Sequence, residues 1–302
     1  MKRKVVVIGL GHLGAHVMEI LAISGIANEL VGIDYNKKKE WGEIRDLADM
    51  MPYLGKQTLI RSGSYEDLAD ADIAVMTACG KICDEDRLQE LSGSIAVIDQ
   101  ILPEVQKNHF KGTMIVLTNP CDLIAWYISQ KIDADVIGTG TALDSARLRA
   151  RVAETLGLAP SDIQGYCIGE HGDSQTIVWS QMRAGGLPVE QLLTEEQKAQ
   201  IEKETITAGC EIALHKGSTE FGIGISAVQI IQAILGDEHK ILPCSVDPKG
   251  KYGQSGFYIG IPCIISKEGA TPLKELDLTE EERNRFDQSC EMLKNMIKKI
   301  SC

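Results

Sequence analysis

The sequence has no uninterrupted apolar run long enough to cross a bilayer, which takes about 18 residues. Charged residues or histidine interrupt every apolar stretch sooner. The stretch 1–8 resembles the charged and apolar regions of a secretory signal, but His12, His16 and Glu19 interrupt the apolar residues that follow it. We therefore expect neither a membrane span nor a secretory signal.

The sequence also lacks an excess of basic residues. Its 31 lysines and arginines are outnumbered by 43 aspartates and glutamates, which gives a formal net charge of -12. Such a charge repels the phosphates of nucleic acids and anionic membrane surfaces. We therefore expect no nucleic acid and no membrane as a partner.

Cysteines spaced for metal binding are missing as well. Nine cysteines are scattered from Cys79 to Cys302, with no C-x-x-C pair and no paired His–Cys spacing that suggests zinc. An odd number of scattered cysteines is typical of reduced thiols in the cytosol. The sequence thus predicts a cytoplasmic protein without a metal site.

The first half of the 302-residue chain alternates short apolar, β-branched segments with stretches of helical periodicity. The predicted strands are 4–9, 30–34, 58–61, 72–78, 113–119 and 136–139, and the predicted helices are 12–24, 37–50, 86–108 and 122–130. This alternation predicts an α/β fold, a doubly wound parallel sheet of the Rossmann type.

The pattern changes after Thr141. The predicted helices are then 143–156, 194–216, 223–235 and 279–300, and the extended segments are 164–168, 176–180, 241–246 and 257–265. The mixture is typical of an α+β fold. We therefore predict two domains, a Rossmann domain at 1–142 and an α+β domain at 143–302.

A glycine pattern marks the first predicted turn. Gly9, Gly11 and Gly14 form G-x-G-x-x-G directly after a strand and at the start of a helix, and Asp34 ends the second strand 20 residues after Gly14. Such glycines let a backbone approach a pyrophosphate, and such an acid accepts hydrogen bonds from ribose hydroxyls but repels a 2′-phosphate. The pattern predicts that residues 1–142 bind NAD rather than NADP, through the whole turn including His12 and Leu13. The alternative is a flexible turn and an exposed strand-end acid.

Two further motifs contain candidate catalytic residues. Gly169-Glu170-His171-Gly172 places an accessible histidine on a turn, and such a side chain can exchange a proton near neutral pH. Asp144 and Arg147 share one face at a predicted helix start. A carboxylate beside imidazole fixes its tautomer, and the arginine fork matches a substrate carboxylate. The alternatives are a capping or metal-binding histidine and an intrahelical ion pair.

These motifs carry a family resemblance. The segments GLGHLG at 9–14, Thr118-Asn119-Pro120, GTGTALDSAR at 138–147 and GEHGDSQ at 169–175 are similar to those of the lactate/malate dehydrogenase family. The chain most resembles the L-2-hydroxyisocaproate dehydrogenase branch, over nearly its whole length.

The resemblance implies an NAD-dependent L-2-hydroxy acid dehydrogenase that is a homo-oligomer, either a dimer or a tetramer, with residues 143–302 as its substrate-binding domain. His171 would be the general acid–base, Asp144 its orienting partner and Arg147 the clamp on the substrate carboxylate. Further implied roles are cofactor and substrate contact for Asn119, carbonyl polarisation from a mobile loop for Arg87, and lining of the side-chain pocket for Thr219.

The loop before Arg87 bears on the substrate. Relatives carry a glutamine there for lactate or an arginine for malate, whereas residues 79–86 contain neither. A second substrate carboxylate then lacks its partner, although Lys81 leaves malate open. We expect a monocarboxylic 2-oxo acid such as 2-oxoisocaproate, then pyruvate, then the malate reaction.

Two further expectations concern regulation. Arg149 matches half of the sugar-bisphosphate site of allosteric relatives, but Gln164 replaces the histidine, so we expect no such activation and an exposed Arg149. Oxidation of Cys79 or Cys83 near the loop is a further hypothesis.

Two other classes of protein remain alternatives. An NAD-dependent glycosidase has a similar nucleotide fold but needs a divalent metal, and a non-catalytic NAD-sensing module would not need His171, Asp144, Arg147 and Arg87.

Overall fold

The computed structural model describes residues 3–80 and 87–300, with side chains from residue 90 onward in the second stretch. These residues form two compact units, and neither is one continuous piece of chain. Unit 1 comprises Met1–Gly138, Glu220–Lys240 and Ile265–Ala270, and unit 2 comprises Thr139–Thr219, Ile241–Ile264 and Thr271–Cys302. The two units interleave along the sequence, so they do not correspond to a single boundary. The predicted domain boundary after residue 142 stays a prediction.

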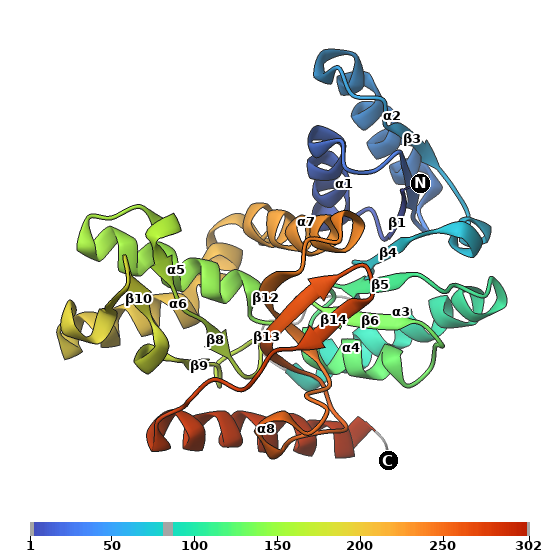
Figure 1. Cartoon of the computed structure of the whole chain (residues 1–302). Coiled ribbons are helices and arrows are strands. Elements are labelled where there is room, and N and C mark those ends of the chain that lie inside the picture. The colour runs from blue at the N-terminus through green and yellow to red at the C-terminus, as the bar shows by residue number, and fades with distance from the viewer. Residues whose placement is uncertain (1–2, 81–86, 301–302) are drawn as a thin grey trace. The chain divides into compact units, whose positions relative to one another are not determined.

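A parallel sheet forms the centre of unit 1 (Figure 1). Its strands are β1 (Lys4–Ile8), β2 (Glu29–Ile33), β3 (Leu59–Ser62), β4 (Ile73–Met76), β5 (Thr113–Val116) and β6 (Asp135–Gly138). They lie in the order β3-β2-β1-β4-β5-β6, and each neighbouring pair is parallel. The order reverses between β1 and β4, and in such sheets ligands bind beyond the carboxyl ends of the strands at this point. The predicted Rossmann-type fold is therefore confirmed.

Helices connect these strands as crossovers. They are α1 (His12–Ser24), α2 (Lys37–Leu54), α3 (Arg87–Lys107) and α4 (Cys121–Ser129), with a 3-10 turn η1 (Tyr65–Asp70) before β4. All five residues of β1 and of β2 are buried, because a parallel sheet is covered on both faces. The continuous apolar runs in the sequence follow from this burial.

A helix from the second half of the sequence completes unit 1. This helix, α7 (Phe221–Gly236), runs beside α1 (Figure 1), and the rings of Phe221 and His16 lie 4.8 Å apart. A Cβ on Gly224 would lie 3.0 Å from Cδ1 of Ile20, so glycine lets the two helices approach closely. Contact between α1 and α7 thus depends on residues far apart in the sequence.

Unit 2 is built from three long helices and several short strands. The helices are α5 (Ala142–Leu156), α6 (Glu195–Lys216) and α8 (Glu280–Ile300). The strands that lie wholly or partly in unit 2 are β7 (Ile163–Gln164), β8 (Cys167–Ile168), β9 (Thr176–Ile177), β10 (Arg183–Ala184), β11 (Leu187–Pro188), β12 (Lys240–Val246), β13 (Ile259–Ser266) and β14 (Gly269–Pro272). The 3-10 turns are η2 (Pro160–Asp162), η3 (Trp179–Gln181), η4 (Val189–Gln191) and η5 (Lys251–Gly253).

A hydrophobic core joins α5 to α6 and the short strands of unit 2. Its buried members are Leu148, Val152, Ala153, Ile163, Cys167, Ile177, Met182, Ala184, Val189, Leu193 and Ile201. Leu148 and Val152 are four residues apart, so they lie on one face of α5. The extended segment predicted at 176–180 is wrong at its end, because η3 begins at Trp179, whose side chain packs against this core.

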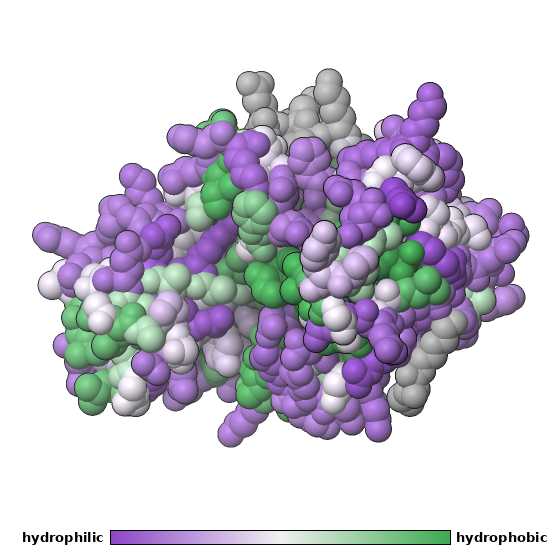
Figure 2. Space-filling view, turned by 90° about the horizontal axis from the view of Figure 1, so that it is seen from above, coloured by the Kyte–Doolittle hydropathy of each residue, from purple (hydrophilic) through white to green (hydrophobic). Residues whose placement is uncertain are grey.

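Most of the surface in Figure 2 is hydrophilic, with smaller hydrophobic patches between the polar side chains. Within the described part of the chain, no helix combines the length and apolar character that a bilayer crossing needs.

Candidate active site

The glycine turn at the end of β1 has the geometry that a dinucleotide requires. Gly9 has φ +97°, and a Cβ there would lie 2.7 Å from the backbone nitrogen of Ala78, so only glycine fits. A Cβ on Gly14 would collide with the carbonyl of Gly9, which also accepts a hydrogen bond from the Thr77 hydroxyl at 2.6 Å. These contacts hold the start of α1 against the ends of β1 and β4.

The space in front of this turn is open. A Cβ on Gly11 would meet nothing within 4 Å, and Gly11 is the N-cap of α1 without a side-chain cap. The first N–H groups of α1 are therefore available to an anion, which favours phosphate at this place. Of the other turn residues, His12 is exposed and pairs with Glu220 at 3.2 Å, and Leu13 is partly buried.

Asp34 lies at the end of β2, as predicted from the spacing. Its carboxylate accepts the N–H of Leu10 at 2.7 Å and the N–H of Asn36 at 2.7 Å, so it also holds the glycine turn in place. Each carboxylate oxygen has a second lone pair and can accept a further hydrogen bond. The open turn, the uncapped helix start and this carboxylate together fit an NAD molecule.

The structure brings His171 and Asp144 into direct contact. Nδ1 of His171 lies 2.6 Å from Oδ2 of Asp144, although the two residues are 27 positions apart in the sequence. Asp144 is almost completely buried, whereas the His171 side chain is 24% exposed and so accessible to a small ligand. An ionised carboxylate only accepts hydrogen bonds, so Nδ1 carries a proton and Nε2 is the ring nitrogen suited to proton exchange with a ligand.

Arg147 contacts the same carboxylate from within α5. Its Nη1 donates to Oδ1 of Asp144 at 3.1 Å, which leaves other N–H groups of the guanidinium for a ligand. Burial raises the pKa of Asp144, but the charges and hydrogen bonds of His171 and Arg147 lower it more, and the net shift is downward. Asp144 is therefore ionised at neutral pH and connects an imidazole to a guanidinium.

Two buried hydroxyls join the helix and the strand that carry these side chains. Thr141 Oγ1 donates to the carbonyl of Cys167 at 2.7 Å, and the N–H of Cys167 donates to Ser145 Oγ at 2.9 Å. Cys167 begins β8, which leads to His171, and both hydroxyls belong to the start of α5. Neither Thr141 nor Ser145 is predicted from the sequence as a site residue, although both stand within the motif that contains Asp144.

The remaining predicted residues are placed as follows. Asn119 is exposed in unit 1, follows β5, has a cis peptide bond to Pro120, and accepts the hydroxyl of Ser94 on its carbonyl at 2.9 Å. Thr219 is partly buried in unit 2. Arg87 begins α3, but its side chain lies outside the described residues, and so do Lys81 and Cys83.

The surroundings of Arg149 and Cys79 bear on the two expectations about regulation. Arg149 is partly buried and donates to the carbonyl of Gly165 at 3.4 Å, so the expectation of an exposed arginine is wrong. Cys79 is exposed at its surface, yet desolvation of its thiol and the charge of Glu90 raise its pKa. A protonated thiol reacts slowly with oxidants, which weakens the hypothesis of redox control at this position.

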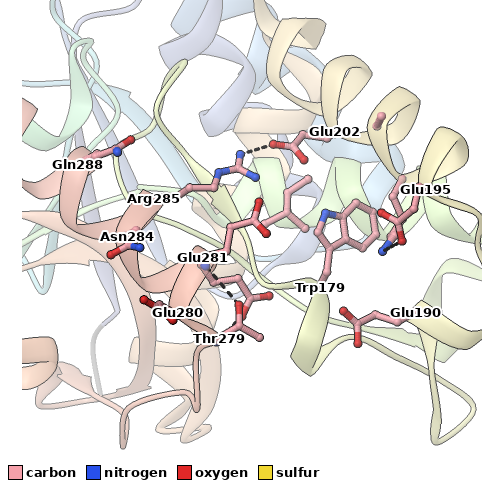
Figure 3. Close-up of a pocket in the computed structure, with 14 residues that line it drawn as sticks. Trp179, Glu190, Glu195, Glu202, Thr279, Glu280, Glu281, Asn284, Arg285 and Gln288 are labelled. Atoms are coloured by element: carbon pink, nitrogen blue, oxygen red, sulfur yellow. Dashed lines mark hydrogen bonds and ion pairs between the residues drawn. The ribbon is translucent and has the colours of Figure 1, made fainter.

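Unit 2 also contains a cavity, which is unsuited to an anionic substrate because acidic side chains surround it. It has a volume of about 840 Å³, and Figure 3 shows Glu190, Glu195, Glu280 and Glu281 around it with the indole of Trp179. Arg285 also lines the cavity but is paired with Glu202. None of the predicted site residues whose side chains the structure describes lines this cavity. Among the residues from 3 to 80 and from 90 to 300, no cluster of three or more His, Cys, Asp or Glu side chains has the arrangement of a metal site.

Comparison with known proteins gives the family. A model of the lactate/malate dehydrogenase NAD-binding domain matches residues 3–137, and a model of the alpha/beta C-terminal domain of the same family matches residues 141–301. L-lactate dehydrogenase 1 of Bifidobacterium longum is 36% identical, over 97% of this chain and 96% of its own.

Solved structures agree over the full length. The ligand-bound minor L-lactate dehydrogenase of Enterococcus mundtii superposes with a TM-score of 0.96 at 34% identity, over 99% of this chain and 98% of its own. The lactate dehydrogenase of Cryptosporidium parvum, solved with lactic acid and nicotinamide adenine dinucleotide, gives 0.95 at 28% identity, over 100% and 98%. The chain therefore belongs to the lactate/malate dehydrogenase family and is an NAD-dependent 2-hydroxy acid dehydrogenase, as its sequence predicts.

Proposed function

We propose that this enzyme interconverts a monocarboxylic L-2-hydroxy acid and its 2-oxo acid, with His171 as the acid–base. The observation that carries the proposal is the contact of one buried carboxylate, Asp144, with both His171 and Arg147. A proton donor and a carboxylate-binding cation, here both in contact with one buried carboxylate, are the two groups that reduction of a 2-oxo acid needs.

The mechanism follows from the chemistry of these side chains. Bound NADH supplies the hydride that reduces the substrate carbonyl carbon. Arg147 binds the substrate carboxylate and thereby fixes the substrate orientation, and His171 gives a proton from Nε2 to the carbonyl oxygen. Asp144 stabilises the protonated imidazole and holds its ring. We assign the remaining contacts as the resemblance implies, with Arg87 on the carbonyl, Asn119 on cofactor and substrate, and Thr219 in the side-chain pocket.

The substrate class rests on the sequence of Cys79–Arg87. A dicarboxylic acid would need a cation for its second carboxylate, and three consecutive acids at 84–86 would oppose it. This supports an aliphatic or aromatic 2-oxo acid of the 2-oxoisocaproate type. The relatives that are named L-lactate dehydrogenases support pyruvate as the second candidate.

We further propose that the enzyme is a cytoplasmic homo-oligomer, a dimer or a tetramer. In support of the compartment, the described cysteines Cys79, Cys121, Cys167, Cys210, Cys244, Cys263 and Cys290 are free thiols. Burial raises the pKa of Cys263 to about 12, so this thiol is an inert core residue.

The test is NADH oxidation measured with 2-oxoisocaproate, pyruvate and oxaloacetate. We expect the highest kcat/KM with 2-oxoisocaproate and the lowest with oxaloacetate. Substitution His171→Asn should lower kcat by roughly 10²- to 10⁴-fold and leave the Kd of NADH unchanged, because the proton donor is lost and the nucleotide turn is intact.

The variant Arg147→Lys serves as the second arm of this test. It keeps the charge but loses the planar fork, so the KM for the 2-oxo acid should rise by roughly 10-fold or more. Full turnover by His171→Asn would exclude the assigned acid–base, and a preference for oxaloacetate would overturn the substrate class.

A further inference from the structure

Besides Asp144, three polar side chains hold the loop that carries His171: Glu170 and Ser174 of the loop itself and Ser289 of α8. The N–H of Glu170 donates to Ser289 Oγ at 2.8 Å, and the hydroxyl of Ser174 donates to Oε2 of Glu170 at 2.7 Å. The two serine hydroxyls are 3.0 Å apart. Ser289 and Glu170 are almost completely buried. Residues immediately before and three positions after His171 are therefore bound to one another and to α8.

The start of the same loop is also fixed. Gly169 has φ +101°, and a Cβ on it would lie 2.9 Å from Ser289 Oγ, so the absence of a side chain lets Ser289 approach. Gly169 and Gly260 exchange two backbone hydrogen bonds of 2.9 Å each. The loop thus enters its turn between a strand of unit 2 and the hydroxyl of Ser289.

Helix α8, which carries Ser289, is itself anchored. Thr279 and Glu282 form a capping box, in which Glu282 Oε2 accepts the N–H of Thr279 at 2.9 Å and Thr279 Oγ1 accepts the N–H of Glu282 at 3.2 Å. Glu282 also accepts the N–H and the hydroxyl of Ser180 at 2.9 Å and 2.7 Å. Figure 3 shows this start of the helix beside Trp179. Ser289 lies two turns further along the same buried face.

A buried serine needs a reason, because an unpaired hydroxyl in an apolar interior costs free energy that an alanine would not. The hydrogen bonds described above for Ser289 all lead to residues 170 and 174 of the His171 loop. Its neighbour Cys290 is equally buried and forms part of the apolar face of α8. The hydroxyl of Ser289 is therefore directed at the loop and not at the helix core.

We propose that Ser289, together with Glu170 and Ser174, is a positioning residue that holds His171 at hydrogen-bond distance from Asp144. This inference rests on the proposed function of His171. Nδ1 of His171 lies 2.6 Å from Oδ2 of Asp144. A displacement of the loop by a fraction of an ångström would lengthen this hydrogen bond and misalign the proton donor.

The experiment compares Ser289→Ala with Cys290→Ala, which removes one buried atom from the neighbouring position of the same helix. We expect Ser289→Ala to lower kcat by about 10- to 100-fold with little change in the Kd of NADH. The pH at which kcat/KM is half-maximal should move down, because a more distant carboxylate stabilises the protonated imidazole less. Any effect of Cys290→Ala should be limited to a lower melting temperature, with kcat and the pH profile unchanged.

Two further variants separate positioning from packing. Ser289→Thr keeps the hydroxyl and should recover most of the turnover, while Ser174→Ala removes the other hydroxyl of the cluster and should reproduce the shift in the pH profile. If Ser289→Ala turns over as fast as the wild type, or if Cys290→Ala loses turnover equally, Ser289 has no positioning role.

A spectroscopic measurement does not depend on turnover. The chain has six histidines, so the imidazole ¹H–¹⁵N spectrum is simple, and His171→Asn identifies the Nδ1–H signal of His171. In Ser289→Ala without substrate this signal should broaden by faster exchange with water, whereas in Cys290→Ala it should not. An unchanged Nδ1–H signal in Ser289→Ala would overturn the positioning role, whether or not the enzyme reduces a 2-oxo acid. If the signal broadens as expected but the wild type reduces no 2-oxo acid, only the proposed function is overturned.

Discussion

At the scale of single residues, Asp144 determines the chemistry of the site. A carboxylate with so little exposure is stable as an ion only when partners replace the lost water, and both of its oxygens have one here, His171 and Arg147. The direction of its pKa shift follows from this competition: burial raises the pKa, and the contacts with His171 and Arg147 lower it by more. The same carboxylate orients the imidazole and holds the guanidinium.

We therefore expect Asp144→Asn to lower kcat by roughly 10²- to 10⁴-fold, because the amide does not fix the imidazole tautomer as a carboxylate does. It should also lower the free energy of unfolding by on the order of 3 kcal/mol at pH 7. The folded pKa lies below the unfolded one, so this stabilisation is complete above about pH 4 to 5 and is lost as the pH falls further. Urea unfolding of wild type and variant between pH 3 and pH 7 measures the difference.

Asp67→Asn is a matched control in unit 1. A hydrogen bond from Arg61 is the main cause of the lowered pKa of Asp67. The ammonium of Lys4, which is almost completely buried, lies 3.0 Å from Oδ1 of Asp67 and lowers this pKa as well. This variant should show the same loss of stability toward high pH relative to wild type and an unchanged kcat. A stability difference for Asp144→Asn that grows as the pH falls would contradict the assigned ionisation.

At the scale of secondary-structure elements, the junction of β1 and α1 separates two roles of glycine. A side chain at Gly14 would collide with the backbone of Gly9, whereas a side chain at Gly11 meets only open space. One glycine is required by the protein itself. The other is required only when a dinucleotide approaches the turn.

The variants Gly14→Ala and Gly11→Ala test this distinction. Gly14→Ala should lower the melting temperature, because α1 must move away from β1 and β4. Gly11→Ala should leave the melting temperature unchanged and raise the Kd of NADH by roughly 10-fold or more, because the backbone is then kept from the pyrophosphate. Differential scanning fluorimetry and NADH fluorescence titration measure the two quantities, and tight NADH binding by Gly11→Ala would contradict the site.

At the scale of the whole molecule, the chain crosses between its compact units several times. Unit 1 takes α7 from residues after 220, and α7 covers α1 through Phe221, Gly224 and their neighbours. The family models, by contrast, divide the sequence at one place, between residues 137 and 141. A boundary in the sequence is therefore not a boundary between units that fold separately.

We expect a fragment of residues 1–142 to fold poorly, because the apolar face of α1 that α7 covers would be exposed to water. The fragment should bind the dye ANS and unfold without a sharp transition. Joining residues 220–240 to it through a flexible linker should reduce dye binding and restore cooperative urea unfolding. A fragment 1–142 that unfolds cooperatively without binding dye would show that α7 is dispensable for unit 1.

Much of unit 1 could be predicted because its signals are local. Residues 5–8 form a continuous apolar run that ends at a glycine, and Asp34 lies at a fixed spacing from the turn. The pairing of His171 with Asp144 could be predicted only by resemblance, since nothing in their spacing of 27 residues requires contact. The 3-10 turn at Trp179 could not be predicted, because the strand ends where this side chain packs against a core formed by residues distant in the sequence.

The sequence by itself determined the alternation of strands and helices and the glycine turn, and it predicts which side chains are candidates for the reaction, because these depend on periodicity, on glycine and on side-chain chemistry. Only the tertiary structure decided that Thr141 and Ser145 join α5 to β8, that Ser289 reaches the His171 loop from 119 residues beyond Glu170, and that α7 belongs with α1. A buried hydroxyl or an apolar helix face has no specific partner in a linear sequence. Its partner is chosen when folding removes both from water, since each must then be satisfied by whatever the fold places beside it.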